Sequence, residues 1–164
     1  MTDDARFEDG AERPVHLAAL DTQDLRVISA LAQDSVLTAA DLAYDAPRRR
    51  FALLLNRFRW EDRARAEKTG DFERVRSMLV VHDVLKVARQ GIDPTDADTV
   101  LSLLALDFTP GPDGTGDITL VFAGDGAVKL SVECVDVVLS DVTRPYRAPA
   151  HRAPDHKTDA PKIE

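Results

Sequence analysis

The residues best suited to contact a ligand form a short stretch in which arginines alternate with aromatic residues. Residues 48–50 are three consecutive arginines, and residues 57–60 read Arg-Phe-Arg-Trp. Guanidinium groups bind phosphates and aromatic rings stack on bases, so this composition is compatible with a nucleic-acid or anion site. The candidate binding residues are Arg49, Arg57, Arg59 and Trp60.

The expected backbone of this stretch argues against a combined arginine–aromatic platform. In an extended strand, Arg57 and Arg59 share one face, whereas Phe58 and Trp60 lie on the other. The two aromatic rings then complete a core while the arginines pair with acidic residues. The net charge of -8 also disfavours a polyanionic partner. We therefore expect a protein or small-anion contact in preference to nucleic acid.

Three further residues are of types that could perform catalysis. His82 and Asp83 are adjacent, and a carboxylate can orient an imidazole for acid–base work. Adjacent strand residues point to opposite faces, however, so their side chains are not expected to meet. Cys134 could be a nucleophile, but its valine-rich surroundings predict a buried structural thiol. A small enzyme or ligand-binding protein with a pocket near His82, Asp83 and Cys134 is therefore an alternative, and no catalytic residue is assigned.

No cofactor or metal site is expected. The single cysteine excludes a multi-cysteine metal centre and an internal disulfide. Asp93, Asp96 and Asp98 lack the spacing and the distal glutamate of a calcium loop. The Gly-Asp-Gly at residues 124–126 lies between two expected strands, whereas a phosphate loop requires a strand followed by a helix.

Composition indicates a cytoplasmic globular protein. The chain has 164 residues, of which 44% are hydrophobic and 30% charged. The first residues are polar and acidic, unlike a signal peptide, and no apolar run approaches the roughly 20 residues that span a bilayer. We therefore expect a reduced cytoplasmic compartment and no membrane association.

The apolar pattern predicts a sheet with few helices. Asp21 or Thr22 can cap a helix in which Leu25, Ile28 and Leu31 recur at helical spacing. The expected strand from Arg49 to Trp60 is apolar on both faces at its middle, which is typical of a central strand covered on both sides. The glycines at 124–126 predict a hairpin turn.

The remaining segments complete an α+β domain. Residues 61–73 read as an exposed connection, and residues 134–142 fit either a strand or a short closing helix, of which we favour the helix. We predict a mostly antiparallel bent sheet or partial barrel of about seven strands with two short helices, of which one version is similar to pleckstrin-homology-like domains. The predicted organisation is a disordered acidic arm (1–14), one domain (15–143) and a disordered proline-rich tail (144–164).

Three strings of residues resemble an uncharacterised alphaproteobacterial family, a domain of unknown function. They are RRFALLLNRFRWE at 49–61, VFAG at 121–124 and LSVEC at 130–134. The resemblance covers about residues 15–143 and implies no activity, cofactor or catalytic residue.

These observations predict a non-catalytic binding or adaptor protein of the bacterial cytoplasm. Its partner would be another protein or a second copy of the chain. The alternatives are the pocket near His82 described above, and nucleic-acid or anion binding through the stretch from Arg48 to Arg59.

Overall fold

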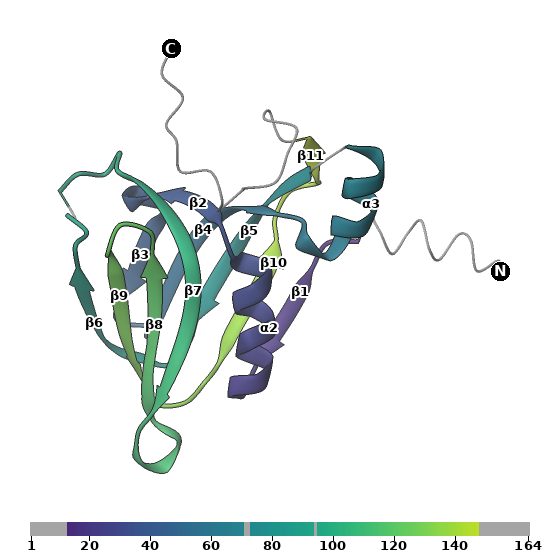
Figure 1. The fold of residues 1–164 in the computed structure, drawn as a ribbon. Coiled ribbons are helices and arrows are strands. Elements are labelled where there is room, and N and C mark those ends of the chain that lie inside the picture. Colours follow the sequence, from purple (N-terminus) through teal and green to yellow (C-terminus); the bar gives the residue numbers. More distant parts are fainter. Residues whose placement is uncertain (1–12, 71–72, 94, 148–164) are drawn as a thin grey trace.

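The computed structural model describes residues 13–70, 73–93 and 95–147, and these residues form one strongly bent sheet with two α-helices (Figure 1). The helices are α2 (Thr22–Ala32) and α3 (Arg63–Thr69), and single 3-10 turns are η1 (Ala39–Asp41), η2 (Trp60–Asp62) and η3 (Pro112–Gly114). The strands are β1 (His16–Ala19), β2 (Ser35–Thr38), β3 (Leu42–Asp45), β4 (Arg50–Phe58), β5 (Glu73–Val81), β6 (Val84–Gln90), β7 (Val100–Pro110), β8 (Gly116–Phe122), β9 (Ala127–Val132), β10 (Val137–Asp141) and β11 (Tyr146–Arg147).

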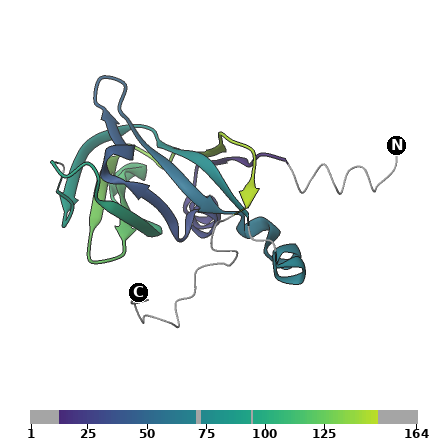
Figure 2. The ribbon, with the colours of Figure 1, turned by 90° about the horizontal axis from the view of Figure 1, so that it is seen from above.

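The strands pair antiparallel in the order β1-β10-β5-β4-β2-β7-β8-β9-β6. In addition, β3 pairs with β4, and β11 pairs with β5. The sheet curls so that β7, β8 and β9 lie in front of β4 and β5 without closing a barrel (Figures 1 and 2). The prediction of a mostly antiparallel sheet with two short helices is therefore confirmed.

The predicted number of strands was wrong, because the described residues contain eleven strands instead of about seven. One reason is that η1 divides the chain before β4 into two short strands, β2 and β3. The two pieces then pair with different parts of β4. A pleckstrin-homology-like fold is not confirmed.

Helix α2 forms where the sequence predicts it. The Asp21 side chain accepts a hydrogen bond of 2.8 Å from the Asp24 backbone N–H, which satisfies one of the unpaired donors of the first turn. Leu25, Ile28 and Ala32 are buried on one face, and they belong to the core enclosed by the bent sheet. The helix lies across the opening between β1 and β7 (Figure 1).

The predicted helix at residues 134–142 was wrong. This segment contains β10, which lies between β1 and β5. Its β-branched valines fit a pleated surface better than a helix, and its pairing partners are remote in the sequence. The second helix is α3, which lies within the segment expected to be an exposed connection.

Strand β4 is central, as its apolar pattern predicts. It pairs along its length with β5 on one side, and with β2 and β3 on the other. Phe51, Leu53 and Leu55 are fully buried on its inner face. These three side chains of β4 belong to the hydrophobic core.

Parts of the expected arm and tail lie outside the described residues, namely 1–12 and 148–164. Within the segment expected to be a tail, β11 pairs Tyr146 with Arg74 and Arg147 with Glu73. Among the described residues, no helix is both long and apolar enough to cross a bilayer.

The packing of Gly116 generates a test of the β7–β8 hairpin. A Cβ at this position would lie against the Thr109 carbonyl oxygen and the Phe108 ring. We expect Gly116→Ala to lower the free energy of unfolding by about 1–3 kcal/mol, because overpacking displaces backbone. Urea denaturation measures the change. Thr119→Ala in the same strand is the control and should cost less than about 1 kcal/mol; equal losses would contradict the clash.

Candidate functional site

The polar centre of the molecule is the guanidinium of Arg57, near the end of β4. Its side chain is 0% exposed, and each of its three nitrogens has a hydrogen-bond partner. Nη1 and Nη2 each donate to one oxygen of Glu61 at 2.9 Å, and Nη2 also donates to Asp141 at 2.9 Å. Nε donates to the Ser77 hydroxyl at 2.9 Å. This bidentate pairing of the Arg57 guanidinium with the Glu61 carboxylate is stronger than a hydrogen bond between neutral groups.

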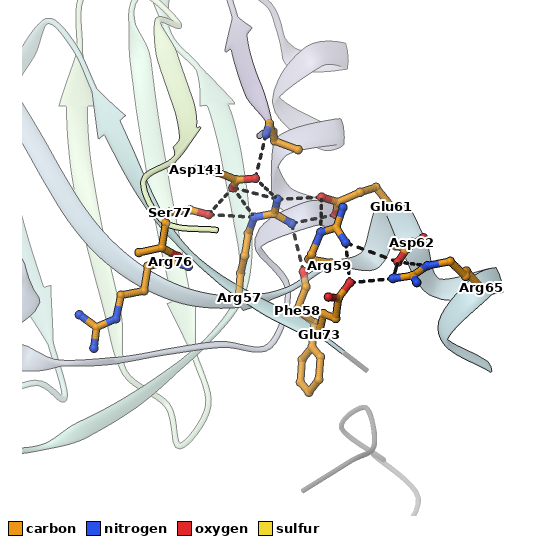
Figure 3. Close-up of polar contacts among 12 residues, drawn as sticks. Arg57, Phe58, Arg59, Glu61, Asp62, Arg65, Glu73, Arg76, Ser77 and Asp141 are labelled. Atoms are coloured by element: carbon orange, nitrogen blue, oxygen red, sulfur yellow. Dashed lines mark hydrogen bonds and ion pairs between the residues drawn. The ribbon is translucent and has the colours of Figure 1, made fainter. Parts of the chain in front are cut away.

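Asp141 connects the buried guanidinium to other strands. Its carboxylate accepts a 2.6 Å hydrogen bond from the Ser77 hydroxyl and a 2.8 Å bond from the Val15 backbone N–H. Residues from β4, β5 and β10, and the residue before β1, therefore meet at one charge pair (Figure 3). Burial tends to lower the pKa of Arg57, but the bonds and charges of Glu61 and Asp141 outweigh it, so that the pKa is raised. The guanidinium stays charged.

A second layer of ion pairs surrounds Arg59, which follows β4 directly. Its side chain is 4% exposed, and Nη1 lies 2.7 Å from Glu73 and 3.4 Å from Asp62. Arg65 on α3 donates to the same two carboxylates, each at 2.7 Å. We call the two layers together the arginine cluster; it comprises Arg57, Arg59, Arg65, Glu61, Asp62, Glu73, Asp141 and Ser77 (Figure 3).

A cavity of about 420 Å³ adjoins the arginine cluster. Its lining combines the apolar side chains of Val15, Leu17 and Leu31 with the charged cluster members Arg59, Glu61 and Asp62. Arg13 and His16 also line it. The cavity lies between β1, α2 and the start of η2. Its size and its mixture of apolar and polar walls are within the range of small-molecule sites.

The structure places the predicted binding residues in different environments. Arg49 is half-exposed and pairs with Glu133 at 2.7 Å. The Trp60 indole N–H donates to the Gln33 carbonyl at 2.9 Å. Of the four predicted residues, Arg59 lines the cavity. Arg57 does not line it but pairs with Glu61, which does. The expectation that these arginines pair with acidic residues is confirmed.

The aromatic rings of this stretch are in contact with the guanidinium groups of two other arginines. The Phe58 and Trp60 rings lie 5.6 Å apart between centroids. The Arg74 guanidinium lies 3.8 Å from the Phe58 ring centroid, and Arg63 lies 5.3 Å from that of Trp60. Phe58 is buried, so its face is not available for stacking on a base.

The prediction that Cys134 is buried was wrong, because the residue is exposed in the turn between β9 and β10. Its Sγ donates to the Asp83 carboxylate at 3.4 Å. Partial desolvation, the hydrogen bond to Asp83 and the negative charges of Asp83, Asp136 and Glu133 raise the pKa of Cys134. No hydrogen bond joins His82 to either residue in the described part of the chain. The cavity is lined by none of the three.

Sequence reasoning missed the acidic half of the cluster. Glu61, Asp62 and Glu73 lie in or beside the segment expected to be an exposed connection, and Asp141 lies in the segment expected to be a helix. Only for Glu61 did the sequence carry a local indication of its partner, because Glu61 lies four residues after Arg57. Among the described residues, no three side chains of His, Cys, Asp or Glu are placed so that they could hold a metal ion together. The carboxylates of the arginine cluster form ion pairs with guanidiniums instead.

The buried position of Arg57 generates a stability prediction. Arg57→Met leaves the Asp141 carboxylate, 3% exposed, without its countercharge. We expect the free energy of unfolding to fall by about 3–5 kcal/mol, because an unpaired buried charge is costly. Urea denaturation followed by circular dichroism measures the loss.

The matched control is Arg49→Met, which removes an exposed pair and should change stability by at most about 1 kcal/mol. Arg57→Met/Asp141→Leu should recover part of the loss, since no orphaned carboxylate remains at Asp141. Equal effects of the two single substitutions would contradict the assigned role of Arg57.

The environment of Cys134 generates a reactivity prediction. Alkylation requires the thiolate, so the raised pKa should make Cys134 react with iodoacetamide more slowly at neutral pH than free cysteine does, despite its exposure. When the alkylation rate of Cys134 is plotted against pH, its midpoint should lie at a higher pH than that of free cysteine. The midpoint should move to a lower pH in Asp83→Asn, which removes one negative charge and a hydrogen-bonding carboxylate beside the thiol. Asparagine tolerates the positive φ of 58° at this position. A midpoint at or below that of free cysteine, measured by mass spectrometry, would contradict this assignment.

Comparison with known proteins adds a family relationship. The family model described as "Protein of unknown function (DUF2948)" matches residues 15–156. No curated protein and no solved structure shows significant similarity to the chain. The matched segment contains β1 to β11, the arginine cluster and the cavity residues from Val15 onward. The chain therefore belongs to the DUF2948 family, whose function is not known.

Proposed function

We propose that this protein is a non-catalytic binding protein of the bacterial cytoplasm, and that its ligand site is the cavity beside the arginine cluster. The observation that carries the proposal is that one cavity is lined both by the apolar side chains of Val15, Leu17 and Leu31 and by charged residues of the arginine cluster. Such a site suits a small molecule with an apolar part and an anionic group.

The fixed charges around the cavity compensate one another. Both oxygens of Glu61 accept from Arg57, and Asp62 accepts from Arg59 and Arg65. Each of the four carboxylates of the arginine cluster is paired with a guanidinium of Arg57, Arg59 or Arg65, and Arg13, which also lines the cavity, makes the number of guanidiniums equal to that of carboxylates. A ligand therefore meets no uncompensated carboxylate that would repel an anion.

Two potential donors at the cavity support an anionic ligand group. Arg13 has no hydrogen-bond or ion-pair partner among the described residues. His16 contacts the Ser140 hydroxyl through Nδ1 at 2.8 Å, and its Nε2 has no partner in the described part of the chain. Together they give the cavity N–H groups suited to a carboxylate or phosphate.

Binding is favoured over catalysis because the cavity gathers paired charges and apolar groups instead of a nucleophile beside a base. The exposed thiol of Cys134 lies elsewhere. Nucleic-acid binding has less support, because the Arg57 and Arg59 guanidiniums are already directed at carboxylates. The cytoplasmic location rests on the acidic composition and the single free thiol. We also propose one domain over 15–143, flanked by the arm 1–14 and by the tail 144–164, which begins with the short strand β11 that pairs with β5.

Binding to amphipathic probes tests the proposal. Titration of ¹⁵N-labelled protein with octanoate should shift the amide signals of Val15, Leu17 and Leu31 saturably. Octylammonium, with the same chain and the opposite charge, should shift them far less, because the available donors favour an anion. Nuclear magnetic resonance measures both titrations.

Arg13→Gln should weaken octanoate binding by about threefold to tenfold through loss of a charged contact. Arg89→Gln, an exposed residue of β6, is the matched control and should leave the affinity unchanged. Equal shifts with both probes, or octanoate shifts outside the cavity only, would contradict the proposed site.

A further inference from the structure

A second cavity, of about 200 Å³, lies where strand β2 separates from β4. The two strands pair at a single position, Val36 with Asn56, whereas β2 pairs with β7 over four residues. The chain then turns through η1 before β3 resumes the pairing with β4. The path of the chain therefore leaves a gap between the strands, and this cavity shares no lining residue with the cavity beside the arginine cluster.

Part of the lining of this second cavity is apolar. Val36 and Leu37 of β2, Leu54 of β4 and Val100 of β7 contribute hydrocarbon groups. Leu37 is buried, whereas Val100 is 68% exposed and remains accessible to a ligand. A ligand can therefore bury a hydrocarbon group here. The volume is below the roughly 300–1,000 Å³ of pockets for drug-sized ligands, so that the ligand has few heavy atoms.

The guanidinium of Arg76 brings a positive charge to this cavity. Arg76 lies on β5 directly opposite Asn56, and Figure 3 shows its side chain directed away from the arginine cluster. The side chain is exposed and has no hydrogen-bond or ion-pair partner among the described residues. Its donors are therefore available to a carboxylate, which a guanidinium can bind through two hydrogen bonds.

The amide of Asn56 is a neighbour of this guanidinium, because residues directly opposite on paired strands share a face. Its Oδ1 is buried and accepts no hydrogen bond within the described part of the chain, an arrangement that lowers stability. Its Nδ2 has no partner among the same residues. A branched apolar side chain would pack here without that cost, so the amide points to a contact made by its N–H groups outside the chain.

The carboxylate of Asp41, in η1, brings a negative charge to the same cavity. Its Oδ2 accepts a hydrogen bond from the Thr38 backbone N–H at 2.9 Å and one from the Thr38 hydroxyl at 3.1 Å. These bonds hold the carboxylate in place, and its Oδ1 accepts from no group in the part of the chain that the structure describes. No ion pair joins Asp41 to Arg76 there either, so the cavity presents two opposite charges that are both free to pair with a ligand.

We propose that this cavity binds a small zwitterion, namely an α-amino acid with a short apolar side chain. The ligand carboxylate pairs with Arg76 and with Asn56 Nδ2, and the ligand ammonium group pairs with Asp41. The ligand side chain packs on Leu54 and Val36.

An α-amino acid carries both charges and a hydrocarbon group on one carbon, so it supplies all three contacts within a small volume. A ligand with a single charge would desolvate the opposite charge of the site without pairing it, which disfavours binding. The site is separate from the anion site proposed above, and each is tested with its own probe.

Titration of the full ¹⁵N-labelled chain with L-valine tests the proposal by nuclear magnetic resonance. The amide signals of Val36, Thr38 and Leu54 should shift saturably, with a dissociation constant in the millimolar range. Isobutylamine and isovalerate retain the hydrocarbon group of valine but each lack one of its charges, and they should bind at least fivefold more weakly. Absence of saturable shifts with valine, or equal affinity for valine and for either of these probes, would overturn the proposal.

Two substitutions test the two charges separately. Arg76→Gln and Asp41→Asn should each weaken valine binding about fivefold to tenfold through loss of one charged contact. Asparagine keeps a side-chain oxygen that can accept from the Thr38 N–H, so η1 remains capped. Circular dichroism checks that both variants are folded.

The matched controls are Arg89→Gln on β6 and Asp107→Asn on β7, which remove the same charges at exposed positions outside the cavity. Both should leave the affinity for valine unchanged. Losses in the controls as large as those in Arg76→Gln and Asp41→Asn, or no loss in either of the latter, would overturn the proposed site.

Discussion

The burial of one positive charge constrains the rest of this structure. The Arg57 guanidinium is removed from water inside the sheet, and such a charge is tolerated only when its partners are close and correctly oriented. The Asp141 and Ser77 side chains supply these partners from β10 and β5, and Glu61 supplies them from η2. The pairing of three strands and the position of the chain after β4 are therefore coupled to a single side chain.

The same constraint shapes the cavity. Because Asp141 also accepts from the Val15 N–H, the chain entering β1 is held beside the cluster. Glu61 is directed toward Arg57 by two hydrogen bonds, so its carboxylate forms a fixed wall of the cavity. The charges facing the proposed ligand are thus ordered before it binds, which reduces the entropy lost on binding.

Local sequence patterns predicted the elements whose stabilising contacts are local. Helix α2 has its cap and its apolar stripe within a few residues, and the hairpin at 124–126 depends on its own glycines and aspartate. Strand β10 was predicted as a helix because its valines occur at helical spacing, and the pairing that makes it a strand comes from β1 and β5. Of the candidate site, the arginines could be predicted, but their partners could not, since Asp141 is 84 residues from Arg57 in the sequence.

The sequence by itself determined that this chain forms an antiparallel sheet, that β4 is its central strand, and that its arginines pair with acidic residues. These features follow from residue type and from periodicity along one segment. Only the tertiary structure decided which carboxylates surround Arg57, where the cavity lies, and which face of β4 packs into the core. The physical reason is that charge pairing and burial depend on contacts between distant segments, and these exist only once the sheet has formed.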